Sequence, residues 1–281
     1  MEAVIGAVLI LLAMGVVLGL VIGVAAKVFA VEIDPRIEQI EELLPSANCG
    51  ACGFAGCADF ARALVAGQTT PDVCPSTAED EIARIAALLG VDVGARDPKV
   101  AVIRCAGDDR LTKKTIRYNG VADCRSANPV AGGPKACRYG CTGLGTCARV
   151  CPFNAIEITA QNLAVVHPDI CTGCGKCVAG CPRDLIVIVP KSAPLHVLCN
   201  NPEKGAACNK VCSVACIGCR KCVKEAAEGQ MTMDGFLAAV NYDNPPGAEL
   251  CDVCPTKCLQ PSLLVGSNPP APQAEEEVAN G

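Results

Sequence analysis

The chain has 281 residues, of which 23 are cysteine, with three tyrosines, no tryptophan and a formal net charge of −5. A core so poor in aromatic side chains favours several small domains crosslinked by metal clusters over one large domain. The odd number of cysteines and their ligand-like spacing favour a reduced, cytoplasm-facing protein over a disulfide-bonded secreted one. The acidic balance gives no indication of nucleic-acid binding.

Residues 1–30 are predicted to form a transmembrane anchor. No charged side chain falls between residues 3 and 26, and this stretch is long enough to cross a bilayer as a helix, which takes about 20 residues. A cleaved signal peptide is the alternative, but the apolar run is longer than usual and is preceded by Glu2 rather than by a basic residue. Lys27 and Arg36 follow the span. This indicates a single-pass protein of the inner (cytoplasmic) membrane whose cluster domains lie on the cytoplasmic side.

Residues 31–92 are predicted to form a small helical domain. An amphipathic helix is expected over residues 32–44, and an apolar helix over residues 58–66. Cysteines separated by glycines are typical of a 4Fe–4S site, because glycine lets the backbone wrap closely and point its amides at sulfur. The spacing also fits zinc, but the rest of the chain favours iron. The predicted ligands are Cys49, Cys52, Cys57 and Cys74.

Residues 93–132 are predicted to be a linker that contains a short strand over residues 100–105. Cys105 and Cys124 have no motif around them. A lone cytosolic cysteine is most often a small buried side chain. The alternative is an auxiliary ligand, so both cysteines stay unassigned.

Residues 133–192 contain the most specific motif of the chain. Residues 171–182 match the run C-x2-C-x2-C-x3-C-P of two-cluster bacterial ferredoxins, whose fourth cysteine binds the neighbouring cluster. Residues 137–152 form a variant of this run, with Leu144 where the middle cysteine falls. Crossed ligation then assigns one 4Fe–4S cluster to Cys137, Cys141, Cys147 and Cys181. It assigns a second cluster to Cys171, Cys174, Cys177 and Cys151.

Residues 193–264 repeat this module in degenerate form. A cysteine pattern that begins at Cys124 recurs 75 positions later, from Cys199 (199 − 124), which predicts a second ferredoxin-like domain. The copy has Ala226 where Cys151 stood, and two later cysteines are missing. A fourth cluster is predicted on Cys216, Cys219, Cys222 and Cys254. The cysteines left without a role are Cys199, Cys208, Cys212, Cys251 and Cys258.

The expected fold class is α+β, divided among small domains: a transmembrane helix, a helical 4Fe–4S domain, a two-cluster ferredoxin-like domain and a degenerate ferredoxin-like domain. A disordered acidic tail is expected over residues 265–281. The predicted cofactors are 4Fe–4S clusters, three with full motifs and a fourth with a damaged one. No catalytic residue is assigned, because electron transfer needs no acid, base or nucleophile. A zinc-binding scaffold is the alternative of another class, but it leaves the paired Cys-Pro runs unexplained.

The chain resembles the B subunit of the Rnf electron-transport complexes. The resemblance is carried by the N-terminal apolar run, by residues 48–75 and by the run that starts Cys137-Arg-Tyr-Gly-Cys141. An extended form of the family shares residues 215–222 and a Cys-Pro-Thr-Lys-Cys ending, here residues 254–258.

The resemblance implies a component of a membrane translocase that moves electrons between ferredoxin and NAD, coupled to Na+ or H+ transport. The implied partners are ferredoxin, as electron donor or acceptor, and the other membrane and peripheral subunits, which carry the catalytic and ion sites. Lys176, Lys221 and Lys224 lie beside predicted clusters. One interpretation is that they help dock an acidic ferredoxin, and the alternative is that they form ordinary solvated surface. A membrane-tethered polyferredoxin serving another reductase or hydrogenase is the alternative, since it needs the same ligands.

Overall fold

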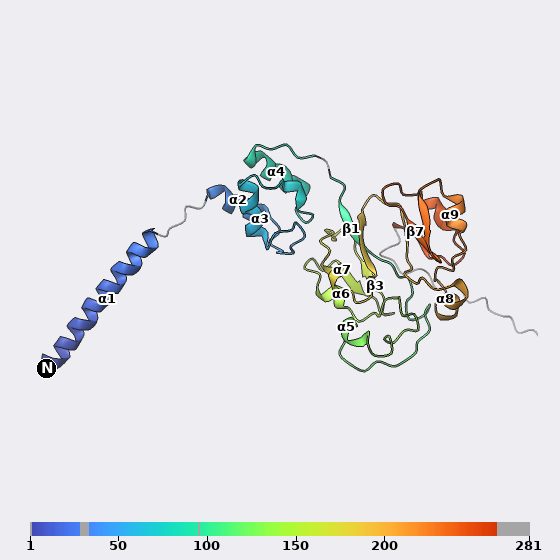
Figure 1. Ribbon diagram of the computed structural model, residues 1–281, viewed down its shortest axis with the longest axis horizontal. Helices are drawn as coiled ribbons and strands as arrows, with labels where there is room; N and C mark the ends of the chain where they lie inside the picture. The colour runs from blue at the N-terminus through green and yellow to red at the C-terminus, as the bar shows by residue number, and fades with distance from the viewer. Residues whose placement is uncertain (1, 29–33, 95, 263–281) are drawn as a thin grey trace, which may run out of the picture.

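The computed structural model describes residues 2–28, 34–94 and 96–262, which are arranged as Figure 1 shows. Helix α1 (Glu2–Val28) is an apolar rod of 27 residues, about 40 Å long at the rise of an α-helix. Its stretch Leu11–Val28 is long and apolar enough to cross a membrane, and none of that stretch is buried against the rest of the chain. An apolar N-terminal helix therefore lies where the membrane anchor was predicted.

Three helices and a 3-10 turn form a small helical unit after α1. Asp34 begins α2, because its carboxylate accepts a hydrogen bond of 2.9 Å from the backbone amide of Arg36. The apolar faces of the helices meet in one core around Ile40, Phe60 and Ile85. The elements are α2 (Pro35–Leu43), α3 (Cys57–Val65), η1 (Pro71–Val73) and α4 (Glu79–Leu89).

A first module of short helices and strands follows. Strands β2 and β3 form an antiparallel hairpin between the two cysteine runs, with Ile156 opposite Val166. The strand expected in the linker is also present and pairs antiparallel with β4, with Val102 opposite Val187. The elements are β1 (Lys99–Ile103), α5 (Cys124–Ala127), α6 (Thr146–Arg149), β2 (Ile156–Ile158), β3 (Ala164–Val166), α7 (Lys176–Gly180) and β4 (Ile186–Pro190).

The second module repeats this plan with two more two-stranded antiparallel sheets, β5–β8 and β6–β7. Figure 1 shows it packed beside the first module, with β7 and α9 on the side away from the helical unit. The elements are β5 (Leu195–Val197), α8 (Gly205–Val211), α9 (Lys221–Glu225), β6 (Met231–Asp234), β7 (Leu237–Val240), η2 (Ala248–Val253) and β8 (Leu259–Pro261).

The β1–β4 sheet is shared by the two modules. Successive side chains of a strand point to opposite faces, and β1 is buried on both. Ala101 and Ile103 pack into the core of the first module, whereas Val100 and Val102 pack into the core of the second. An isolated two-stranded sheet is at best marginally stable in water. Burial on both faces therefore stabilises this sheet and joins the modules into one body.

The structure is a mixture of short helices and short strands behind an apolar N-terminal helix, in keeping with the α+β class that was expected. Within the described residues the strands form four two-stranded sheets. The acidic tail expected over residues 265–281 lies outside the described residues.

Two side chains of α4, one buried and one exposed, provide a matched test of packing in the helical unit. Ile85 is 0% exposed and Leu88 is 41% exposed. We expect Ile85→Ala to lower the free energy of unfolding by about 2–5 kcal/mol, because it leaves a cavity in the core. Leu88→Ala, the control, should change it by no more than about 0.5 kcal/mol. Anaerobic denaturant unfolding of both variants measures the difference, and equal midpoints would contradict the packing described here.

Candidate metal centres

All 23 cysteines lie in the described part of the chain, and none is in a disulfide. Most of them gather in five groups, here named A to E. Within the described residues, no three His, Cys, Asp or Glu side chains converge closely enough to hold a single metal ion.

Group A consists of the four cysteines predicted for the helical unit: Cys49, Cys52, Cys57 and Cys74. The loop before α3 is fixed by Asn48, whose side-chain oxygen accepts a hydrogen bond of 2.8 Å from the amide of Cys57. Burial raises the pKa of Cys52, and the nearby Cys74 and Cys49 raise it further. These sulfurs therefore lie close enough to repel one another as thiolates.

Group B consists of Cys171, Cys174 and Cys177, together with Cys151 from the preceding cysteine run, as crossed ligation predicts. Burial raises the pKa of Cys177 to about 12, with contributions from the other three thiols. Backbone amides point at two of the sulfurs: Ala101 donates to Cys171 at 3.3 Å and Ala155 donates to Cys151 at 3.4 Å. Such hydrogen bonds tune the potential of a bound cluster.

Group C lines one cavity beneath the β1–β4 sheet and consists of Cys124, Cys141, Cys147 and Cys181. Burial raises the pKa of Cys147 to about 12, and the other three thiols of the group contribute to the rise. Three of these residues belong to the predicted set, but Cys124 lies where Cys137 was expected. The structure does not bring Cys137 into this cavity.

A hydrogen-bonded chain holds Cys124 in place at the start of α5. Its amide donates to the Thr146 hydroxyl at 2.8 Å, and that hydroxyl donates to Asp123 at 2.7 Å. The same bond to Thr146, with bonds from Ser126 and Arg149, lowers the pKa of Asp123 to about 2. Asp123 therefore caps α5 as a carboxylate and ties α5 to α6, which carries Cys147.

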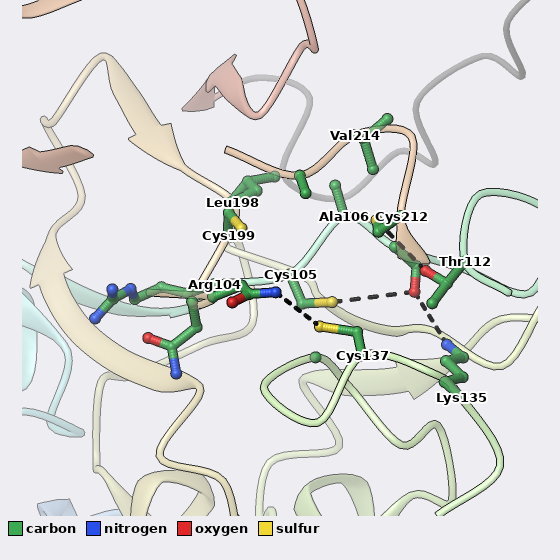
Figure 2. Close-up of a pocket in the computed structure, with 15 residues that line it drawn as sticks. Arg104, Cys105, Ala106, Thr112, Lys135, Cys137, Leu198, Cys199, Cys212 and Val214 are labelled. Atoms are coloured by element: carbon green, nitrogen blue, oxygen red, sulfur yellow. Dashed lines mark hydrogen bonds between the residues drawn. The ribbon is translucent and has the colours of Figure 1, made fainter. Parts of the chain in front are cut away.

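Group D was not predicted and lines a separate cavity between the two modules (Figure 2). Cys137 lies here instead of in group C. Its neighbours are three cysteines to which the sequence assigned no role. The members are Cys105, Cys137, Cys199 and Cys212. The recurrence of the cysteine pattern was the only sequence signal for two of them.

Group E contains the fourth predicted set, Cys216, Cys219, Cys222 and Cys254. Burial raises the pKa of Cys222 to about 11, and the other three thiols contribute. Cys258 adds a fifth sulfur, 3.4 Å from that of Cys254. The hydrogen bond from Cys258 lowers the pKa of Cys254 to about 5. Cys219 is the exposed member of the group.

Cys208 and Cys251 belong to none of the five groups. The Cys208 thiol is buried in α8 and donates to the Glu203 carbonyl at 3.1 Å, so it behaves as a core side chain. Cys251 lies in η2, and burial raises its pKa to about 11.

Neighbouring groups lie against one another. Ser76, whose hydroxyl lies 3.9 Å from the Cys49 sulfur, donates to Thr172 at 3.0 Å and so links group A to group B. Cys177 of group B contributes to the raised pKa of Cys147 in group C, after burial and the thiols of group C itself. Groups A, B and C therefore form a continuous series.

This arrangement of cysteines on short helices and hairpins defines an iron–sulfur protein of the ferredoxin type. Comparison with known families agrees: residues 44–76 match the family "Putative Fe-S cluster", and residues 139–186 match the family "4Fe-4S dicluster domain".

Whole-chain relatives show the particular family. The chain is 36% identical to the B subunit of the ion-translocating oxidoreductase complex of Methanosarcina acetivorans, over 91% of its length and 97% of that protein. It is 36% identical, over the full length of both chains, to the B subunit of the proton-translocating ferredoxin:NAD(+) oxidoreductase complex of Clostridium ljungdahlii. A third relative is the B subunit of the Na(+)-translocating ferredoxin:NAD(+) oxidoreductase complex of Acetobacterium woodii, which is 38% identical over 90% of this chain and 77% of its own. The chain belongs to this family of B subunits, which is the Rnf family.

Two glycines of the group B loop give a matched test of its geometry. Gly173 and Gly175 both have a positive φ, +70° and +76°. A Cβ at Gly173 would lie 2.5 Å from the carbonyl oxygen of Lys99, whereas a Cβ at Gly175 would meet nothing within 4 Å. Gly175→Ala should therefore cost only about 1–2 kcal/mol of backbone strain. Gly173→Ala should in addition push the loop off β1 and lower the iron content by about four atoms per chain. Equal iron in the two variants would contradict this.

Proposed function

We propose that the chain is the iron–sulfur electron-transfer component of a membrane complex that moves electrons between ferredoxin and NAD, coupled to ion translocation. The observation that carries the proposal is the pairing of full-length similarity to Rnf-family B subunits with cysteine groups lying in series. Two of those relatives are named for different ions, so the proposal extends to translocation but to neither ion in particular.

We assign one 4Fe–4S cluster to each of groups A, B, C and E. The donor set supports this, because cysteine thiolates are the usual ligands of such clusters. For group C the placement of Cys124 beside Cys141 and Cys147 supports Cys124 as the fourth ligand, in place of the Cys137 that spacing predicted. The assigned ligands are Cys49, Cys52, Cys57 and Cys74; Cys151, Cys171, Cys174 and Cys177; Cys124, Cys141, Cys147 and Cys181; and Cys216, Cys219, Cys222 and Cys254.

A bound cluster supplies one-electron transfer, and the chain's own residues place and tune it. Buried thiols are held close together at a raised pKa, and amides such as that of Ala101 donate to the sulfurs. In the described residues nothing resembles a flavin or nicotinamide site, so we place those on other subunits, the partners of this chain in the complex.

We place the cluster-bearing part on the cytoplasmic side of the inner membrane, held there by α1. Lys27 in the last turn of α1 and Arg36 just beyond the helix support this orientation.

Metal analysis of the full chain tests the assignment. Protein purified without oxygen should contain at least about 16 iron atoms per chain with matching acid-labile sulfide, and no stoichiometric zinc. Little iron with several zinc atoms, in protein that is folded, would overturn the electron-transfer proposal in favour of a zinc scaffold. Co-purification with a different reductase or hydrogenase would favour the polyferredoxin alternative.

We propose that ferredoxin docks over group E. Cys219 is exposed there, and it is followed by Arg220, Lys221 and Lys224, all exposed. Positive charge around the outermost cluster would steer an acidic partner toward it. Lys176 is likewise exposed beside group B, where it lines a shallow surface shared with Cys49.

Charge reversal tests this docking surface. Lys221→Glu/Lys224→Glu should lower the second-order rate of electron transfer with ferredoxin about tenfold at low salt, with the difference shrinking as salt increases. The matched control is Arg62→Glu/Arg84→Glu, which changes the net charge equally at exposed positions of α3 and α4, in the helical unit on the far side from α9 in Figure 1. If both double variants react alike, ferredoxin docks elsewhere.

A further inference from the structure

The cavity between the two modules collects four cysteines from four separate segments (Figure 2). Cys105 follows β1, Cys137 is the first residue of the first cysteine run, Cys199 follows β5 and Cys212 is the C-cap of α8. Three of the four thiols are buried and Cys105 is partly exposed. No motif links these positions, so only the fold brings them together.

The sulfurs lie close together across the cavity. Burial raises the pKa of Cys137, and Cys212 raises it further. Burial also raises the pKa of Cys199 to about 12, with a contribution from Cys105. Burial raises the pKa of Cys105 too, and Cys137 adds to that rise. Each thiol thus lies near at least one other thiol of the group. Thiolates this close repel one another, so four of them are stable together only around positive charge.

Two glycines keep the space between the sulfurs open. A Cβ at Gly140 would lie 3.4 Å from the sulfurs of both Cys105 and Cys137. A Cβ at Gly107 would lie 3.1 Å from the sulfur of Cys212. A side chain at either position would crowd the thiols, as it would crowd a group bound among them.

Hydrogen-bond donors point at three of the four sulfurs. The amide of Cys141 donates to Cys105 at 3.2 Å, the Thr112 hydroxyl donates to Cys212 at 3.5 Å, and the Asn201 side chain donates to Cys137 at 3.8 Å. A backbone hydrogen bond from Asn201 also lowers the pKa of Cys199 against its burial. Donors of this kind stabilise thiolates and the clusters they bind.

A buried cation completes the site. Lys135 is 3% exposed, and its ammonium donates to the carbonyls of Gly107 at 3.0 Å and Asn162 at 2.7 Å. It lies 3.9 Å from the carboxylate of Asp109, a longer contact than either hydrogen bond. Its charge opposes the effect of burial on the pKa of Cys105. A buried lysine needs compensating negative charge, which a cluster ligated by four thiolates provides.

The repeat within the chain explains why these cysteines are available. Leu144 stands where a middle cysteine would fall in the first module, and Cys124 fills group C in its stead. The equivalent position in the second module is Cys219 (219 − 144 = 75), so group E is complete without Cys199, the counterpart of Cys124. Cys137 and Cys199 are therefore both left free for the cavity between the modules.

We propose that Cys105, Cys137, Cys199 and Cys212 bind a fifth 4Fe–4S cluster that bridges the two ferredoxin-like modules. Group D lies between groups C and E: the amide of Cys141 in group C donates to Cys105, and a backbone hydrogen bond from Cys216 in group E reaches Cys199. Each transfer along the series oxidises one cluster by one electron and reduces its neighbour by one. This role as a bridge rests on the proposed electron-transfer function, whereas the existence of the site does not.

Native mass spectrometry of the full chain, purified without oxygen and reconstituted with iron and sulfide, counts the clusters directly. We expect five in the wild type and four in each of Cys105→Ala and Cys212→Ala, with iron falling from about 20 to about 16 atoms per chain. Dithionite-reduced samples should lose the spin of one cluster in the electron paramagnetic resonance spectrum. Cys208→Ala, which removes a buried thiol outside the site, is the control and should keep five.

The proposal would be overturned if either site variant held as many clusters as the wild type, or if it lost zinc instead of iron. A wild-type chain that holds between one and four clusters overturns it as well, and this result needs no variant to fold. A wild-type chain without iron would instead refute the proposed function as a whole, so the two failures are distinguishable.

Discussion

The structure depends on placing many thiols close together in regions that water does not reach. Burial raises the pKa of Cys147, Cys177 and Cys199 to about 12, so as free thiols they would stay protonated. They become thiolates only around positively charged iron. Metal binding is then coupled to folding, because the ligands come from distant segments and no such site exists in the unfolded chain. Sheets of two strands and helices of four or five residues are too small to be stable without these crosslinks.

The β1–β4 sheet converts separate cluster-binding units into one body. Its alternate side chains enter two cores, Ala101 and Ile103 on one face and Val100 and Val102 on the other. The sheet also supplies the Ala101 amide that donates to Cys171, and β1 leads directly to Cys105. The element that joins the modules mechanically therefore also places residues of groups B and D, which suits a protein that must hold successive clusters at fixed separations.

Duplication of the module allowed ligands to be exchanged between sites. In the proposed assignment group C draws on Cys124, because Leu144 carries no sulfur, whereas group E has Cys219 in the equivalent place. Cys137 of the first copy, and Cys199 and Cys212 of the second, then line the cavity between the copies. The relatives of this chain are named as components of ion-translocating oxidoreductases. In such a family, the proposed series of clusters through this boundary would give a function to a second module that lacks the cysteines for one of its own clusters.

The sequence by itself determined the apolar N-terminal helix, the iron–sulfur class, the strand after the helical unit and the three clustered cysteines of a run such as Cys171, Cys174 and Cys177. Within one tight loop, spacing sets where each sulfur points. Crossed ligation also predicted that Cys151 and Cys181 join the clustered cysteines of the other run. The place of Cys124 was decided only by tertiary structure: spacing favoured Cys137, but the packing of α5 on α6 through Thr146 brings Cys124 to the cavity. Group D has no motif, because its four cysteines meet only once two modules pack on a shared sheet.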